Sequence, residues 1–169
     1  HRIAADRGNT DSFTSLGWFH EHGLAVEMDP SRAAELYERA ARLGNLRAMN
    51  NLGVLFAEGR GRERDPARAA ELYLRAAEGG FSLAMRNLAL AHHDGLGVER
   101  DDRRAAQWMF RAAAGGEPRA VRDMLERPRR FSATFWRELQ GLLEDAGHDP
   151  GPIDGRPGPR TRAAIEALS

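Results

Sequence analysis

Ala48–Gly59 (AMNNLGVLFAEG) and Asp65–Gly80 (DPARAAELYLRAAEGG) decide the fold of this chain, because their pattern recurs at a spacing of 36 residues. Equivalent positions lie on both sides of them: Leu16-Gly17, Leu52-Gly53 and Leu88-Ala89; Gly23, Gly59 and Gly95; Asp29, Asp65 and Asp101; Gly44, Gly80 and Gly116. A fixed period of this length is typical of repeat proteins in which each unit is one supersecondary motif. The sequence therefore predicts a stack of three similar units.

Each unit is predicted to be a pair of helices. The first helix carries one apolar stripe at helical spacing, formed in the middle unit by Ala48, Leu52, Leu55 and Phe56. The first helices are expected at about residues 11–22, 47–58 and 83–94. Gly59 is placed to end the first helix in a left-handed conformation, and Asp65 with the proline after it caps the second. The small residue Gly53 is interpreted as the point where the Ala-rich face of the second helix approaches closely.

The limits of the pattern predict the modules of the chain. Ala4–Asn9 aligns with Ala40–Asn45, so the chain is expected to begin in the tail of an earlier hairpin. One more helix of the kind that begins each hairpin is expected at Glu117–Glu126, without a partner helix, and it would cap the stack. We predict a repeat array over residues 1–127, a linker over residues 128–132 and a second, incomplete domain over residues 133–169.

The composition excludes several classes of function. The chain has 41% hydrophobic residues, a formal net charge of +0 and no Cys. Disulfides, thiolate metal sites and a Cys nucleophile are therefore excluded, and neither disorder nor a nucleic-acid partner is indicated. No apolar run reaches the roughly 18 residues of a membrane helix. We expect no cofactor, and a membrane contact only through an anchor upstream of residue 1.

The third unit carries the most complete version of the repeat. Residues Ala84–Gly116 contain, in order, a small residue, a Leu-small pair, an aromatic, Gly-Leu-Gly-Val, Asp, paired Ala and Ala-Ala-x-x-Gly. This pattern resembles the Sel1-like repeat of the tetratricopeptide superfamily, over about residues 2–126. The resemblance implies an all-α, right-handed α-solenoid used for protein–protein contact, with no chemistry of its own.

The tail carries a different set of motifs: Leu139-Gln140, Gly147-x-x-x-Gly151, Ile153-Asp154-Gly155, Gly158-Pro159-x-Thr161 and Ala164-Ile165. It resembles the type-1 peptidoglycan-binding domain, a small helical module, which implies association with the cell wall. The family has aromatic or Phe-Gln residues where this chain has His148, Pro157 and Leu168-Ser169. The motif residues Asp154, Gly155, Gly158 and Thr161 are expected to be largely structural, with Thr161 capping the helix that follows.

The order of the two modules resembles the periplasmic part of PodJ-like bacterial cell-pole scaffolds. That resemblance implies a non-enzymatic periplasmic scaffold that holds a protein partner, associates with peptidoglycan and takes part in cell-pole organisation. Two alternatives stay open. The chain could be the targeting or regulatory part of a cell-wall hydrolase or remodelling enzyme, or a cytoplasmic adaptor with a degenerate tail domain.

The concave groove of the tetratricopeptide superfamily maps onto one face of the first helices. The candidate partner-binding residues are Thr14, Trp18, Asn50, Val54, Arg86, Leu90 and Arg122. The wider mapping adds Asp11, Glu21, His22, Arg47, Ala57, Glu58, Leu83, His93, Asp94 and Arg119. An apolar row beside a row that becomes cationic toward Arg122 suits a peptide partner with carboxylates, because Arg pairs with carboxylates bidentately. The alternative is that Val54 and Leu90 are core residues and the arginines are solvated.

Three other clusters have a structural interpretation. His20 and His92 occupy the position of Phe56, a core aromatic site, so packing explains the histidines better than a metal site does. Four carboxylates could be considered as a catalytic pair for glycan hydrolysis: Glu138, Glu144, Asp145 and Asp149. They lie on a polar helix face and an adjacent loop, and no pocket is implied there, so hydrolysis is not predicted. The arginine run at residues 127–130 is short and is interpreted as a solvated linker. No catalytic residue or metal ligand is therefore predicted.

Overall fold

The computed structural model of the chain describes residues 2–168, and the side chains of residues 10–168. The regular elements of the described residues are all helices: α1 (Arg2–His22), α2 (Pro30–Arg42), α3 (Leu46–Glu58), α4 (Pro66–Glu78), α5 (Ser82–Asp94), α6 (Asp102–Ala114), α7 (Pro118–Glu126), the 3-10 helix η1 (Pro128–Arg130), α8 (Ala133–Asp145) and α9 (Pro159–Glu166). Internal contacts divide the chain into two compact units, unit 1 ending at Phe81 and unit 2 beginning at Ser82. The predicted all-α class is confirmed.

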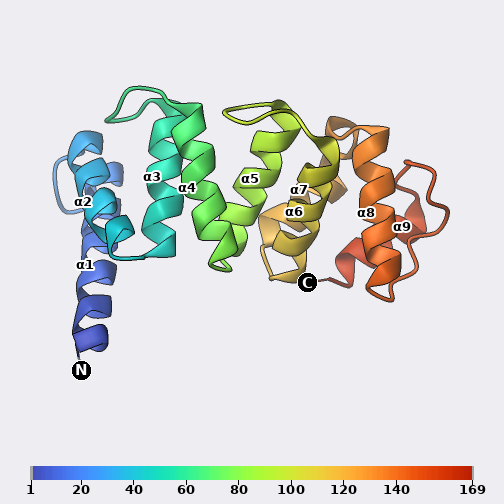
Figure 1. The fold of residues 1–169 in the computed structure, drawn as a ribbon, viewed down its shortest axis with the longest axis horizontal. Coiled ribbons are helices and arrows are strands. Elements are labelled where there is room, and N and C mark those ends of the chain that lie inside the picture. Colours follow the sequence, from blue (N-terminus) through green and yellow to red (C-terminus); the bar gives the residue numbers. More distant parts are fainter. Residues whose placement is uncertain (1, 169) are drawn as a thin grey trace. The chain divides into compact units, whose positions relative to one another are not determined.

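Unit 1 consists of two helical hairpins, α1 with α2 and α3 with α4 (Figure 1). Local chemistry fixes their ends as the sequence predicts. The Asp65 carboxylate accepts a hydrogen bond from the Arg68 backbone N–H at 3.0 Å, and Pro66 is the first residue of α4. Gly59 closes α3 in a left-handed conformation, with φ of 71°. The caps satisfy backbone groups that the helix itself leaves without a partner.

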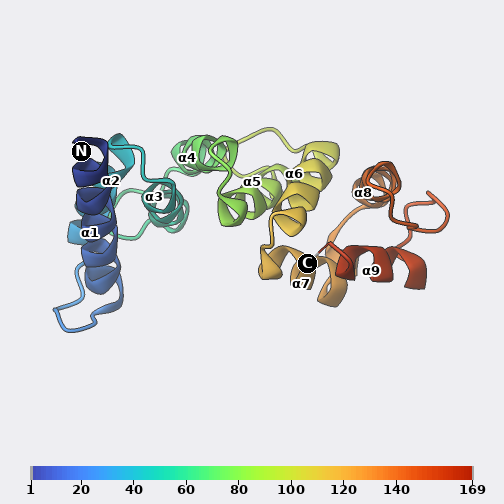
Figure 2. The same cartoon turned by 90° about the horizontal axis from the view of Figure 1, so that it is seen from below.

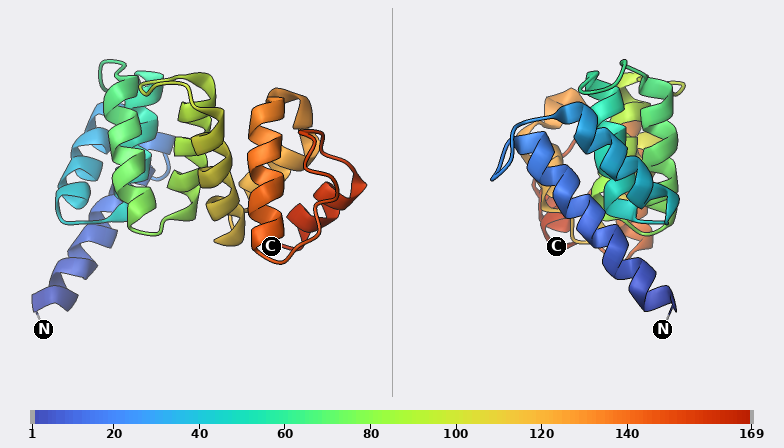
Figure 3. Two further views of the ribbon diagram at one scale, coloured as in Figure 1. Left: turned by 45° about the vertical axis from the view of Figure 1, so that its right-hand side comes forward. Right: turned by 90° about the vertical axis from the view of Figure 1, so that its left-hand side faces the viewer.

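The beginning of α1 differs from the prediction. The helix was expected from about residue 11, after a glycine equivalent to Gly44, but α1 begins at Arg2 and runs through Gly8. Its first turns extend beyond α2 (Figure 3). A glycine within a helix costs only about 1 kcal/mol relative to alanine, so glycine alone does not end a helix. Whether residues 1–9 are the tail of an earlier repeat stays a prediction.

A tyrosine ring sets the size limit at the mid-helix glycine. A Cβ on Gly53 would lie 2.6 Å from the Tyr73 Cε1 and 3.2 Å from the Ala69 carbonyl oxygen, and one on Gly17 would lie 2.8 Å from the Tyr37 Cε1. The tyrosine ring of the second helix therefore makes the closest approach to the glycine. The prediction that the Ala-rich face of the second helix is the main cause was wrong. The third hairpin carries Ala89 and Met109 at these two positions, so the larger residue appears where the ring is absent.

Unit 2 combines the third hairpin with the tail. Its core joins alanines and methionines of α6 and α7 to large apolar side chains of α8 and α9: Ala105, Ala106, Met109, Ala112, Ala120, Met124, Phe135, Trp136, Leu139, Leu143 and Ile165. Helix α8 packs along α6, and α9 lies against α7 and α8 (Figure 2). The third hairpin is therefore covered by α8 as well as by the predicted capping helix α7.

The segment predicted to be a linker is ordered and bonded. The Trp136 Nε1–H donates to the Pro128 carbonyl oxygen at 3.1 Å, and Arg130 pairs with Asp94 at 2.7 Å. Of the arginine run interpreted as a solvated linker, Arg130 is therefore paired, whereas Arg127 and Arg129 are exposed as expected. The module boundaries at residues 127–128 and 132–133 stay a prediction, although both sides of them contribute to one core.

Candidate functional site

Residues predicted to line a groove in unit 1 fall into two groups. Thr14 and Asn50 are buried, 5% and 1% exposed, and the Thr14 hydroxyl donates to the Thr10 carbonyl oxygen at 2.7 Å. Val54 is half-buried, and Trp18 is 42% exposed. Of these four residues Trp18 is therefore the one that is open to a partner, whereas Thr14 and Asn50 are buried in the hairpins.

A hollow of about 470 Å³ lies beside the predicted groove positions of unit 1. Asp11, Thr14 and Ser15 of α1 form one wall, and the start of α3 with Phe81 forms the other. Asn45 ties the two walls together, because its Nδ2 donates to the Asp11 carboxylate at 2.9 Å while its Oδ1 caps α3 at the Ala48 backbone N–H. The exposed Arg47 also lines this hollow. The site can therefore offer a cation, a fixed carboxylate and apolar surface.

The exposed aromatic cluster continues the same stripe of α1. Asp11, Ser15, Trp18 and His22 follow one another at helical spacing and are all exposed. The rings of Trp18 and His22 lie 4.6 Å apart, and the His22 Nδ1 is 2.9 Å from the Trp18 carbonyl oxygen. This stripe and the hollow together form the candidate site.

Glu21 was mapped to the groove but lies in a buried network. The Tyr37 hydroxyl donates to Glu21 at 2.7 Å, and Arg60 reaches the other carboxylate oxygen at 3.1 Å. Burial and the adjacent Glu21 raise the pKa of Tyr37 well above its ordinary value of 10.0. The three side chains therefore fix the first hairpin against the loop after α3.

In unit 2 most of the predicted groove residues have internal partners. Arg86 pairs with Asp123 through its Nε at 2.7 Å and its Nη2 at 2.6 Å, and Asp123 is only 7% exposed. Leu90 packs against the unit 2 core, and Arg122 is exposed. The Arg86 charge is therefore already neutralised by a carboxylate from α7, a partner that the sequence analysis did not identify.

The histidines near the end of α5 hold the structure together. His92 is buried, and its Nδ1 lies 3.3 Å from the Glu99 carbonyl oxygen. The His93 Nδ1 lies 2.8 Å from Asp102, and its Nε2 lies 2.9 Å from the Arg130 carbonyl oxygen. Both neighbours are acceptors, so a doubly protonated ring donates both bonds and a neutral ring only one. Among the described residues, no group of three or more His, Asp and Glu side chains is arranged to hold a metal ion.

A buried glutamine organises the motif residues of the tail. Gln140 accepts from the Gly155 backbone N–H at 2.9 Å and donates to the Arg156 carbonyl oxygen at 3.0 Å and toward Thr161 at 3.3 Å. A Cβ on Gly155 would lie 2.7 Å from the Ala133 carbonyl oxygen. These contacts account for the motif as a structural unit.

The tail shows one departure from the predicted local structure. Thr161 lies within α9 and donates to the Pro150 carbonyl oxygen at 2.7 Å, so the prediction that it caps this helix was wrong. Gly158 is the residue before α9 and cannot supply a side-chain cap. Asp154 is exposed, and hydrogen bonding from the Arg156 backbone N–H lowers its pKa.

The repeat matches a known family model. The model described as the Sel1 repeat matches residues 14–45, 46–81 and 82–117, which is more than half of the chain. The chain belongs to the Sel1-repeat family. Its hairpins are therefore repeats of a solenoid class whose stacked units generally serve as protein-interaction surfaces.

Two solved structures are similar to this Sel1-repeat chain. The first is a Sel1 repeat protein from Oxalobacter formigenes, with a TM-score of 0.72 and 22% identity over 97% of this chain and 58% of that one. The second is a protective antigen of uropathogenic Escherichia coli strains that displays an SLR fold, with a TM-score of 0.64 and 24% identity over 99% of this chain and 39% of that one. The chain therefore spans less than two thirds of either relative, and these similarities support the solenoid fold alone.

No curated protein sequence matches this chain. Within the described residues, no helix is long and apolar enough to cross a membrane.

Proposed function

We propose that this Sel1-repeat chain is a non-enzymatic scaffold that binds a protein partner on the first-helix stripe of unit 1. The observation that carries the proposal is the exposure of Trp18, at 42%, on the stripe that continues into the hollow beside Arg47. Tryptophan and arginine are enriched among the residues that dominate binding energy at protein interfaces. Repeat solenoids use extended faces of this kind to bind partners.

The chemistry of the stripe favours a peptide with an apolar anchor and a carboxylate. The exposed part of the Trp18 side chain is available to an apolar side chain, and Arg47 can pair with a carboxylate close to the hollow. The Asp11 carboxylate already accepts from Asn45 and is held in place. This proposal assigns fewer arginines to the partner site than the predicted cationic row contains, because Arg86 is already paired with Asp123.

A comparison of affinity capture between the parent and matched variants tests the partner site. Affinity capture on the purified chain from extract of the native cells, followed by quantitative mass spectrometry, is compared between the parent and a Trp18→Ala/Arg47→Glu variant. The variant should lose about 90% or more of the specific partner, since loss of two interface anchors costs about 1.4 kcal/mol or more. An Arg103→Glu variant changes another exposed charge, on α6, and should capture the partner as the parent does. Equal capture by all three proteins would refute the site.

We also propose that the scaffold is periplasmic, associates with peptidoglycan through its tail and contributes to cell-pole organisation. The support is the motif sequence of residues 139–165, together with the bonding of Gln140 to the Asp154–Arg156 turn. Ile153 and Arg156 on this turn are exposed, so they are available to a wall polymer.

Point variants test wall association better than truncation does. Removal of the chain after residue 127 would also remove Phe135 and Trp136 from the unit 2 core and leave the third hairpin uncovered. An Ile153→Asp/Arg156→Glu variant changes only exposed side chains. Sedimentation with purified sacculi should fall severalfold for this variant and stay unchanged for Arg103→Glu, and equal recovery of all proteins would refute the role of the tail.

A further inference from the structure

A second groove lies on the other side of unit 1, between the second helices of its two hairpins. It has a volume of about 490 Å³, within the range of roughly 300–1,000 Å³ that is usual for ligand sites. Its floor is apolar and comes from three helices: Ala41 of α2, Leu52 of α3 and Leu72 of α4, which are 5%, 3% and 8% exposed. None of the partner-binding residues predicted from the sequence lines it.

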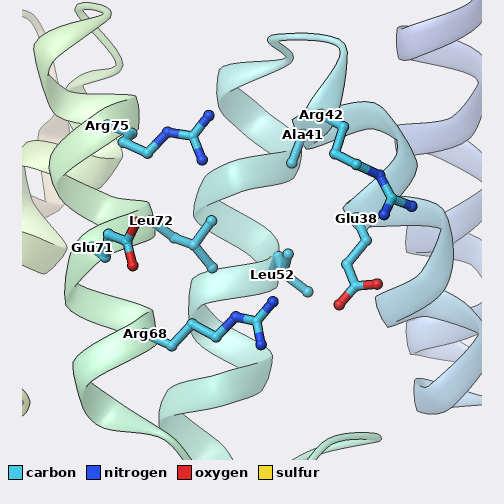
Figure 4. A pocket seen from close by; sticks show the side chains of 8 residues that line it. All are labelled: Glu38, Ala41, Arg42, Leu52, Arg68, Glu71, Leu72 and Arg75. Atoms are coloured by element: carbon cyan, nitrogen blue, oxygen red, sulfur yellow. The ribbon is translucent and has the colours of Figure 1, made fainter.

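The rim of this groove carries three arginines. Arg68 and Arg75 extend from α4 toward α2 on either side of Leu72 (Figure 4). Arg42 lies at the end of α2, and all three arginines are exposed. The Arg68 guanidinium lies 4.7 Å from the centre of the Phe56 ring, which fixes its position over the floor.

Two carboxylates interrupt the cationic rim. Glu38 projects from α2 and pairs with Arg62 at 3.5 Å, and Glu71 lies on α4 between Arg68 and Arg75. The rim therefore has three positive and two negative side chains, of which Glu38 is already partnered. Such a surface attracts a few well-placed carboxylates, but it repels a uniformly anionic polymer or membrane surface at Glu71.

We propose that this groove binds an acidic peptide segment of a partner protein. One apolar side chain of the peptide packs on Leu52 and Leu72, and carboxylates on either side of it pair with Arg42 and Arg75. Arginine suits this role because its guanidinium pairs bidentately with a carboxylate. The surface is separate from the Trp18 stripe, so the scaffold would hold two segments at once.

A titration followed by nuclear magnetic resonance tests the proposal directly. The probe is a peptide of about 12 residues made of Glu, Leu and Ala, with glutamates one helical turn before and after a central leucine. Saturable shifts of the backbone resonances of Ala41, Leu52 and Leu72 are expected. An Arg42→Glu/Arg75→Glu variant should bind about tenfold more weakly or worse, because two attractive pairs become repulsive.

Controls separate this groove from the Trp18 stripe. An Arg47→Glu variant carries a charge reversal in the same unit but outside the groove, and it should bind the peptide as the parent does. A peptide with lysine in place of glutamate should not bind. Circular dichroism of each variant establishes that the exposed substitutions leave the fold intact.

Three outcomes would overturn the proposal: no saturable shifts with the acidic peptide, shifts that the double variant retains, or shifts produced by equimolar phosphatidylglycerol–phosphatidylcholine vesicles in place of the peptide. Because Trp18 and Arg47 are unchanged in the double variant, failure here leaves the proposed partner stripe untouched. Loss of partner capture by the Trp18→Ala/Arg47→Glu variant likewise leaves the peptide titration unaffected.

Discussion

The glycine–tyrosine contact of the hairpins yields a prediction that can be worked through in numbers. In Gly53→Ala the new Cβ would lie 2.6 Å from the Tyr73 Cε1, 2.9 Å from its Cδ1 and 3.2 Å from the Ala69 carbonyl oxygen. Overpacking costs about 1–3 kcal/mol. Two separations below 3.0 Å place this variant in the upper part of that range, at about 2–3 kcal/mol, and the gain in helix propensity offsets about 1 kcal/mol of that cost. The variant should therefore be destabilised by about 1–2 kcal/mol.

The third hairpin supplies the compensating change. Because the third hairpin has Ala89 and Met109 where the other hairpins have glycine and tyrosine, Gly53→Ala/Tyr73→Met should be more stable than the sum of the single variants predicts. Neighbouring residues of this kind couple by about 0.5–3 kcal/mol. Urea denaturation of protein labelled with 5-fluorotryptophan, followed by fluorine nuclear magnetic resonance, measures the free energy of unfolding of unit 1. The Trp18 signal reports on unit 1, because Trp108 and Trp136 are in unit 2.

An unchanged stability of Gly53→Ala, or additive single and double variants, would refute this reasoning. The first result would mean that the Tyr73 ring moves aside at no cost. The second would mean that the two positions do not exchange volume, and that Ala89 and Met109 in the third hairpin are unrelated.

Further predictions concern burial and pH. Leu52→Ala should lower the free energy of unfolding in urea by about 2–4 kcal/mol, because Leu52 is only 3% exposed. The repeat-equivalent Leu16→Ala should lower it by less than about 1 kcal/mol, because Leu16 is 40% exposed. Equal costs would contradict the assigned burial. Burial raises the pKa of both tyrosines, Tyr37 and Tyr73, so absorbance titration should show little tyrosinate in the folded chain at pH 10. Unit 1 should then lose stability as the pH rises above that value, because the unfolded chain releases these protons first. Titration of the folded chain at an ordinary tyrosine pKa would refute this. Burial by itself raises the pKa of Asp102, but hydrogen bonds from Ser132 and His93 and the Arg100 charge lower it overall, so the stability advantage of the parent over Asp102→Asn should be present above about pH 4 and disappear as the pH falls further. An advantage that grows on acidification would show that the sign is wrong.

The repeat phase was sufficient to predict the hairpins, because their end signals are local. Asp65 before Pro66 and the left-handed Gly59 act within one helical turn, so the sequence alone places them. The pairing of Gly53 with Tyr73 was also visible in principle, because both positions change together in the third hairpin. That signal required a comparison of two positions across the repeats, not of one position along them.

The contacts that escaped the sequence analysis are non-local or depend on depth. Arg86 and Asp123 are 37 residues apart, and no repeat rule links them. Helix register assigned Thr14 to an open face, but its hydroxyl bonds within its own helix and its side chain is buried. The packing of Phe135 against the repeats was missed because α8 lies outside the period.

Site-specific photocrosslinking at position 18 tests the central claim most directly. A photoreactive phenylalanine analogue at Trp18 in the native cells should produce one dominant crosslinked protein, because the side chain at this position faces outward on the proposed partner stripe. The same analogue at Arg103, which is also exposed and lies on α6, should not produce that species. Absence of a crosslink at position 18, or the same product from both positions, would contradict the account of this chain as a scaffold with a partner site on the Trp18 stripe.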